Sequence, residues 1–281
     1  MNTVFKQQTL AGKVEVAGVG LHSGMEARVV LKPAMADEGI TLVRTDVADG
    51  VFHLRPEMVK ASPLCTLLEN GHGVTLSTVE HLLAALHGLG VDNALVEIEG
   101  PEVPIVDGSA LPWVEAIDRA GRVSLAASRT WLKMGEEAAR VEDGDKQSVA
   151  THADEAGLTA DVTIDFAHAL VGRQRWAGFV DEATFRAEIA PARTFVLESQ
   201  VAAARKAGLI KGGSLDNAVV FGDDGTVLNA EGLRFEDEPV RHKVLDLLGD
   251  LYMAGLPVWA RVDAVQPGHT VNNVLLRKIA E

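Results

Sequence analysis

Five residues from three distant parts of the chain have the side chains that a metal-dependent hydrolase needs: Glu80 with His81, His242 with Asp246, and His269. A catalytic zinc ion takes about three ligands from histidine and carboxylate side chains and leaves one position for water. His242 and Asp246 are four residues apart, so on a helix they lie one turn apart on one face. His81 is then a natural third ligand and Glu80 a base beside it. His269, which follows a glycine, could pass a proton to a leaving group.

The same residues also have plainer interpretations. Ser77-Thr78-Val79-Glu80 has the spacing of a helix capping box, in which Glu80 bonds to the helix start instead of doing chemistry. A histidine such as His81 is more often a surface or hydrogen-bonded residue than a ligand. On the predicted helix that carries His242, a polar stripe lies opposite the apolar face, and such a stripe is usually solvated. Spacing alone leaves both interpretations open.

Composition bounds the class of protein. The 281 residues suffice for one large or two ordinary domains, and a 47% hydrophobic content suffices for a full core. The net charge of −14 should repel nucleic acid and anionic membrane surfaces, so substrate phosphates would need local lysines or arginines. The single cysteine, Cys65, excludes an internal disulfide and fits a reducing cytosol. Without a signal peptide or a run of about 18 apolar residues, we expect a cytoplasmic protein with no stable membrane insertion.

Hydrophobic periodicity with regular glycine and proline punctuation predicts a mixed α and β chain. Strands are expected over 13–20, 26–32, 94–98 and 161–166. Helices are expected over 77–88, 111–120, 197–207 and 239–253. A hairpin is expected around the turn Glu142–Asp145, and a short apolar strand at Leu209-Ile210.

An Ala- and Ser-rich stretch near 122–130 predicts a domain boundary, which divides the chain into 1–125 and 126–281. One short echo bears on the relation of these halves: residues 92–96 and 216–220 share the pattern D-N-A-apolar-V. A match this short is as consistent with accident as with duplication.

Other short motifs carry little chemistry. Gly18-Val19-Gly20 and Gly212-Gly213-Ser214 lack the full spacing of phosphate-binding loops and are predicted to be turns. The chain has no G-x-S-x-G motif, and Cys65 has no obvious partner, so nucleophilic catalysis has little support.

Longer strings, distributed along the chain, are far more specific. In order they are GVGLHSG (18–24), LSTVEHLLAALHGLGVDNALVEIEGPEVPIVDGSA (76–110), VEDGDK (141–146), TIDF (163–166), ARTF (192–195), GLRFEDEPVRHKVLDLLGDLYMAG (232–255) and GHTVNN (268–273). With these strings the chain resembles the UDP-3-O-acyl-N-acetylglucosamine deacetylase family, the zinc enzymes of lipid A biosynthesis in Gram-negative bacteria. The resemblance extends from about residue 7 to the end.

The resemblance implies an α+β fold of two similar domains, each a small sheet packed against helices. The domains would be related by duplication, with the active site between them, which favours the duplication interpretation of the echo. The first domain would carry Glu80 and His81. The second would carry an acyl-passage insertion near 195–213 and the remaining catalytic and metal residues, Thr194, His242, Asp246 and His269.

Roles follow for the matching positions. His81, His242 and Asp246 would bind zinc, with ferrous iron as an alternative. Glu80 would be the general base, and His269 the general acid, oriented by Asp250. Thr194 would donate a hydrogen bond to the oxyanion, and Lys243 would contact the polar head of the substrate.

Further positions would contact substrate. Phe166 resembles a platform for the uracil ring, with Lys146 and Asp165 nearby, and Cys65 matches a cysteine near the metal. The acyl chain would run along 195–210, where Leu197, Val201 and Ala204 have helical spacing, although an ordinary core-facing helix has the same pattern. The implied acyl contacts are Phe195, Leu197, Ile210 and Leu215. Two positions depart from the family: Gln266 stands where a lysine is frequent, and Leu215 where an aromatic residue is frequent.

The reaction implied by the resemblance is hydrolysis of the N-acetyl group of UDP-3-O-(3-hydroxyacyl)-N-acetylglucosamine to the free amine and acetate. This is the committed step of lipid A biosynthesis, carried out by a cytoplasmic, monomeric, metal-dependent amidohydrolase. Two other classes stay open: a different metal-dependent hydrolase on the same scaffold, and a non-catalytic binder of nucleotide sugars.

Overall fold

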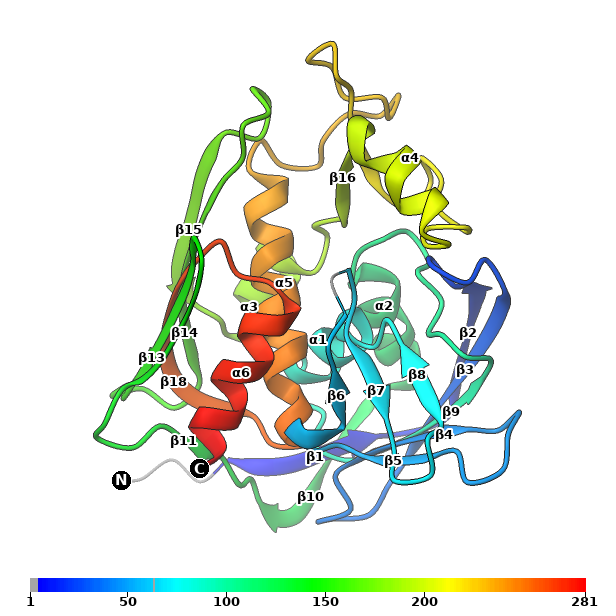
Figure 1. Cartoon of the computed structure of the whole chain (residues 1–281). Coiled ribbons are helices and arrows are strands. Elements are labelled where there is room, and N and C mark those ends of the chain that lie inside the picture. Colours follow the sequence, from blue (N-terminus) through cyan, green and yellow to red (C-terminus); the bar gives the residue numbers. More distant parts are fainter. Residues whose placement is uncertain (1–4, 63) are drawn as a thin grey trace.

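The computed structural model describes residues 5–62 and 64–281. Two larger mixed sheets lie on either side of a central group of helices, with smaller sheets between and beyond them (Figure 1). The chain is therefore an α+β protein, as the sequence predicts. Among the described residues, no helix is long and apolar enough to cross a membrane.

The first large sheet is formed by the N-terminal part of the chain. Its strand order is β2-β3-β9-β4-β5, and β4 runs parallel to β9 while the other neighbours are antiparallel. The strands are β2 (Val14–Val19), β3 (Glu26–Pro33), β4 (Ile40–Arg44), β5 (Val51–His53) and β9 (Ala94–Glu99). The strands expected at 13–20, 26–32 and 94–98 are confirmed.

The second large sheet repeats the strand order of the first, when the strands of each sheet are numbered by their place in the chain. It runs β12-β13-β18-β14-β15, with β14 parallel to β18, and β11 (Leu132–Lys133) adds to β18. The path strands are β12 (Ala139–Asp143), β13 (Lys146–Thr151), β14 (Leu158–Asp165), β15 (Arg173–Phe179) and β18 (Val258–Val265). The expected hairpin is confirmed, because β12 and β13 pair antiparallel across a tight turn.

Each sheet has one helix before and one after its central strand. In the first sheet these are α1 (Glu80–Gly88) and α2 (Leu111–Ala120) around β9. In the second they are α5 (Glu238–Leu251) and α6 (His269–Ala280) around β18. The helices at 111–120 and 239–253 are thus confirmed, the second ending in a short 3-10 turn, Tyr252–Ala254.

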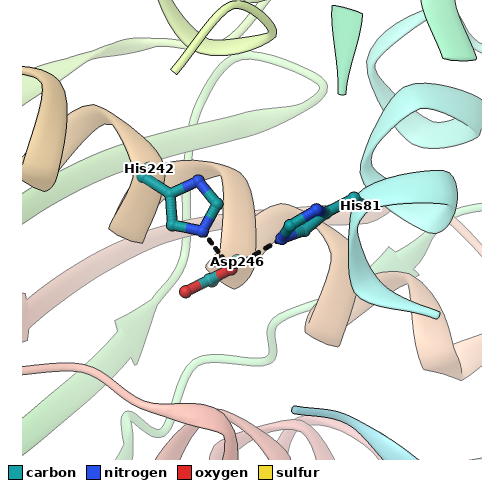
Figure 2. A group of neighbouring side chains, drawn as sticks. All are labelled: His81, His242 and Asp246. Atoms are coloured by element: carbon teal, nitrogen blue, oxygen red, sulfur yellow. Dashed lines mark ion pairs between the residues drawn. The ribbon is translucent and has the colours of Figure 1, made fainter. Parts of the chain in front are cut away.

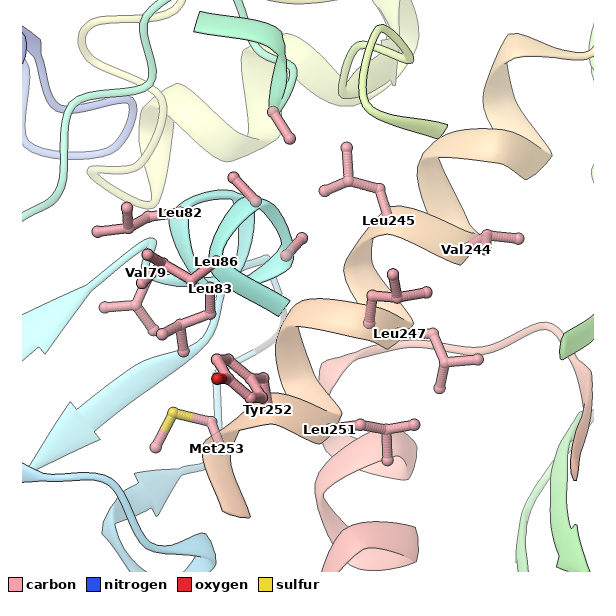
Figure 3. Packing of buried hydrophobic residues seen from close by; sticks show 14 of the residues in the cluster. Val79, Leu82, Leu83, Leu86, Val244, Leu245, Leu247, Leu251, Tyr252 and Met253 are labelled. Carbon is pink, nitrogen blue, oxygen red and sulfur yellow. The ribbon is translucent and has the colours of Figure 1, made fainter. Parts of the chain in front are cut away.

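The contact between α1 and α5 places the functional residues. Leucines of α1 and aliphatic side chains of α5 fill the space around the two helices (Figure 3). Each fully buried leucine contributes about 1.5–3 kcal/mol. A Cβ built at Gly249 of α5 would lie 2.0 Å from the carbonyl oxygen of Glu80. Only glycine at this position lets the first turn of α1 approach α5 so closely.

The smaller elements complete the walls of the molecule. They are β1 (Lys6–Leu10) paired with β10 (Arg122–Ser128), the sheet β6 (Val59–Lys60), β7 (Leu67–Glu69) and β8 (Thr75–Ser77), the pair β16 (Phe195–Leu197) and β17 (Val219–Phe221), α3 (Glu182–Thr184), α4 (Glu198–Lys206), and short 3-10 and π turns at Pro56–Met58 and Phe185–Ile189. The Ala- and Ser-rich stretch near 122–130 is the ordered strand β10.

Three local expectations differ from the structure in whole or in part. The capping box fails because Val79 is the N-cap of α1, the helix begins at Glu80, and the hydroxyl of Ser77 donates to the carbonyl of Pro101. Leu209-Ile210 is irregular backbone, with Ile210 at a φ of 48°. The helix expected over 197–207 is confirmed as α4, which begins at Glu198; only the assignment of Leu197 was wrong, because Leu197 is extended and pairs with Phe221.

The D-N-A echo also does not relate equivalent positions. Residues 92–96 lead into β9, the central strand of the first large sheet, but residues 216–220 lead into β17 of a two-stranded sheet. The strand that occupies the place of β9 in the second large sheet is β18. The echo is therefore no support for a duplication.

Candidate metal centre

His81, His242 and Asp246 converge at one point between α1 and α5 (Figure 2). One ligand atom from each lies within 4.8 Å of the others, and all three side chains are buried. Oδ1 of Asp246 lies 3.3 Å from Nε2 of His242 and 3.8 Å from Nε2 of His81. Two imidazole nitrogens and one carboxylate oxygen are a donor set that suits zinc. The arrangement rules out the solvated-stripe interpretation of α5.

The protonation of this group also fits a cation. Nδ1 of His242 lies 3.0 Å from the carbonyl oxygen of Ala192, which only accepts, so Nδ1 donates to it and Nε2 is the nitrogen that faces Asp246. Burial and the neighbouring His242 lower the pKa of His81 to about 3, so this ring is neutral at pH 7. Although burial opposes ionisation of Asp246, Lys243 and His242 hold its pKa well below the usual value.

Glu80 lies beside the ligands at the start of α1. Its Oε2 accepts the N–H of Thr66 at 3.1 Å, and its Oε1 lies 3.9 Å from Nε2 of His269. Burial raises the pKa of Glu80 to about 8, with Asp250 and Asp246 adding to the effect against His269. The capping-box interpretation of Glu80 was therefore wrong. One oxygen of the Glu80 carboxylate instead faces His269, beside the three predicted metal ligands.

His269 is the first residue of α6 and is held by Asp250 of α5. Nδ1 of His269 lies 3.0 Å from Oδ2 of Asp250, which also accepts the side-chain amide of Asn272 at 2.8 Å. Burial lowers the pKa of His269, but the Asp250 carboxylate outweighs it and raises that pKa to about 9. The imidazole is thus protonated at neutral pH and presents Nε2 to the cavity.

A cavity of about 810 Å³ contains this group. It extends from the three ligands past β16 to α4, and its wall includes most of the predicted substrate residues. They are Lys146, Phe166, Thr194, Phe195, Ile210, Leu215 and Lys243. Phe166 and Phe195 meet edge to face with ring centroids 5.5 Å apart. The Lys243 ammonium lies 5.8 Å from the centre of the Phe195 ring and 2.7 Å from Oδ2 of Asp246.

Four of the predicted site residues, all in the described part of the chain, do not line the cavity: Cys65, Asp165, Leu197 and Asp250. Asp250 lies behind His269. Cys65 is buried next to Glu80, and burial followed by the charge of Glu80 raises the pKa of its thiol to about 12. The backbone N–H of Asp165 donates to Oε1 of Gln266 at 3.1 Å, so Gln266 joins the ends of β14 and β18.

The structure adds two residues that the sequence did not single out. His22 lines the cavity, is 8% exposed, and among the described residues neither ring nitrogen has a hydrogen-bond partner. Thr66 contacts Glu80, Asp250 and His269. The family string that contains His22 was a signal for that residue, but no local pattern marks Thr66, because its contacts come from three distant elements.

Comparisons with known proteins decide the family. The sequence model described as UDP-3-O-acyl N-acetylglycosamine deacetylase matches residues 7–281. The chain belongs to this deacetylase family. A relative named UDP-3-O-acyl-N-acetylglucosamine deacetylase in Anaeromyxobacter sp. (strain Fw109-5) is 46% identical, over 99% of this chain and 89% of the relative. Relatives of the same name are 46% identical in Phenylobacterium zucineum (strain HLK1), over 98% and 93%, and 43% identical in Pasteurella multocida (strain Pm70), over 98% and 90%. Membership in the deacetylase family confirms the resemblance and favours the hydrolase over the nucleotide-sugar binder.

Proposed function

We propose that this chain uses one zinc ion, or ferrous iron, held by His81, His242 and Asp246 to remove the acetyl group from UDP-3-O-(3-hydroxyacyl)-N-acetylglucosamine. As a member of the family, the chain is a deacetylase of lipid A biosynthesis. The observation that carries the residue assignment is the convergence of these three ligands with Glu80 and His269 in one cavity.

Each remaining step falls to a side chain of the protein. When bound, zinc supplies Lewis-acid chemistry, which polarises the amide carbonyl and makes water more acidic. Glu80 takes the proton of the attacking water, and its raised pKa makes it a stronger base than a surface carboxylate. Thr194 donates a hydrogen bond to the developing oxyanion. Protonated His269 passes its Nε2 proton to the departing amine, and acetate leaves.

The shape and chemistry of the cavity support the substrate. Phe166 offers a ring for stacking with uracil, and Lys146 a cation for the diphosphate, which must overcome the net charge of −14. A Cβ at Gly268 would lie 3.8 Å from the Lys146 ammonium, which places this cation beside the residue that directly precedes His269. At the other end Phe195, Val201 and Ile210 form an apolar wall suited to an acyl chain.

We also propose that residues 1–125 and 126–281 are two domains that arose by duplication and enclose the active site. The support is the matching order of strands in the two large sheets, each with one parallel pair at the same place. The segment 195–213 is then an insertion specific to the second domain. We further propose a monomer that acts in the cytoplasm, where the one cysteine stays reduced.

Product identification tests the proposed reaction. The purified protein should convert the UDP-linked N-acetyl substrate to one free amine and one acetate per turnover, measured by mass spectrometry and an acetate assay. Glu80→Gln, which keeps the shape but loses the base, should lower the rate about 100-fold or more. A protein that binds the substrate but releases no acetate would leave the binder as the better description.

A further inference from the structure

Thr66 lies where the first half of the chain meets the second. It is 1% exposed and comes directly before β7, the middle strand of the sheet β6-β7-β8. Its carbonyl accepts the N–H of Thr78 at 3.0 Å, one step beyond the last pair of the β7–β8 ladder. Thr78 has a φ of 59° and turns the chain into α1. The backbone of Thr66 is therefore fixed against the start of the helix that carries Glu80.

The N–H of Thr66 fixes the orientation of the proposed base. It donates to Oε2 of Glu80 at 3.1 Å. With that oxygen engaged, the other oxygen of the carboxylate faces Nε2 of His269 at 3.9 Å. A backbone N–H bonded to one carboxylate oxygen restricts rotation of the side chain about its last torsion.

The hydroxyl of Thr66 reaches the proposed acid and the carboxylate behind it. It donates to Oδ1 of Asp250, and its oxygen lies 3.3 Å from Nδ1 of His269. The carboxylate only accepts, so the single hydroxyl hydrogen points to Asp250. Asp250 is fully buried, with its other oxygen engaged by His269 and Asn272. Loss of the hydroxyl would leave Oδ1 of Asp250 with only the longer, 3.2 Å approach of Nδ1 of His269, which already lies closer to the other oxygen.

We propose that Thr66 is a positioning residue that sets the orientation of Glu80 relative to His269. This inference rests on the proposed roles of those two residues. Glu80 comes from α1, Asp250 from α5 and His269 from α6, and Thr66 contacts all three. Thr66 is not among the described residues that line the cavity. It therefore acts through those three side chains and not on substrate. The inference therefore predicts an effect on kcat and little on KM.

Three variants isolate the hydroxyl. Thr66→Val keeps the backbone N–H and the branched shape but loses the donor, and kcat should fall about 10- to 100-fold with KM and metal content unchanged. Thr66→Ser restores the hydroxyl and should recover most of kcat. Thr9→Val is the matched control, because Thr9 is also buried and its hydroxyl oxygen accepts the N–H of Ala34 far from the site. That control should lower the melting temperature without a change in kcat.

A double-mutant cycle separates positioning from general damage. Thr66→Val should cost much less in an Asp250→Asn background than in the parent, since both changes act on the orientation of His269. An unchanged kcat in folded, metal-loaded Thr66→Val overturns the inference, and so does full additivity with Asp250→Asn. If Thr66→Val does not fold, the comparison of Thr66→Ser with Thr66→Ala decides, and equal kcat in that pair rejects it.

The proposed function is tested alongside by Glu80→Gln and His269→Ala. If these two variants keep full activity, the roles of Glu80 and His269 fail, and the inference fails with them. If they lose activity while Thr66→Val does not, only the inference about Thr66 is wrong.

Discussion

At the residue scale, the site separates the charge states of groups that lie a few ångströms apart. Burial raises the pKa of Glu80 to about 8, whereas the Asp250 carboxylate, acting against burial, raises the pKa of His269 to about 9. One group thus accepts a proton readily, and the other holds a proton for delivery. The sequence predicted both residues and, through the family resemblance, Asp250 beside His269, but it did not predict the contacts of Thr66, which lies far from all three in the chain.

The rate should show a bell-shaped dependence on pH. The rate rises as Glu80 loses its proton. Without metal the pKa of Glu80 is about 8, and a bound dication lowers that pKa, so the rise should occur below pH 8. It falls as His269 loses its proton, near the raised pKa of about 9. Asp250→Asn removes the charge that raises the pKa of His269, so the descending limb should move to lower pH. Identical descending limbs for Asp250→Asn and the parent would show that another group sets it.

A second prediction concerns the cation near the diphosphate. Lys146→Ala should weaken competition by UDP, most strongly at low salt, because the interaction is partly screened by ions. Lys133→Ala is the matched control, since Lys133 lies over the ring of Trp259 outside this cavity. Competition assays at two salt concentrations measure the effect. Equal inhibition by UDP in the two variants at low salt would place the diphosphate elsewhere.

At the scale of elements, the decisive feature is the contact of α1 with α5. The sequence predicted α5 well, since His242 and Asp246 lie one turn apart and the apolar face has a clear period. The start of α1 was predicted poorly, because Ser77 and Glu80 have capping-box spacing while Thr78 adopts a positive φ and moves the helix start. The close approach at Gly249 was also beyond the sequence, because nothing local says which residue faces that glycine.

Gly249→Ala tests this contact. The added Cβ would lie 2.0 Å from the carbonyl oxygen of Glu80, so α1 must shift away from α5. We expect a loss of about 1–3 kcal/mol in the free energy of unfolding, with reduced metal affinity, since His81 moves with α1. Gly135→Ala is the control, because a Cβ there meets no atom within 4 Å among the described residues. Chemical denaturation and metal titration give the two readouts, and equal values for both variants would refute the close contact.

At the scale of the whole molecule, one cavity joins the metal group to an apolar end. The sequence predicted the apolar segment but assigned Leu197 to a helix, whereas it lies in β16 as part of the parallel pair with β17. That pairing joins two segments separated in the chain by residues 198–218, and hydrophobic periodicity does not reveal such a pairing. The alternative of an ordinary core-facing helix does not describe α4, because it has no buried residue and Val201 and Ala204 face the cavity.

Acyl length tests this end of the cavity. Each methylene buried there should add up to about 0.8 kcal/mol of binding, so catalytic efficiency should fall steeply as the acyl chain is shortened. Ile210→Asp and Val201→Asp should remove most of that preference, because a carboxylate in the apolar wall must be desolvated. Efficiency measured over a series of chain lengths gives the answer. A preference that survives in both variants, with activity retained, would locate the acyl chain outside this wall.

The most direct test of the central claim is a zinc titration of the metal-free protein, followed by acetate release. We expect activity to rise in parallel with bound metal and to saturate at about one ion per chain, the occupancy of a single three-ligand site. His81→Ala, His242→Ala and Asp246→Ala should each lose the bound ion or most of the activity. Full acetate release without metal, or full metal content and activity in all three variants, would contradict the account.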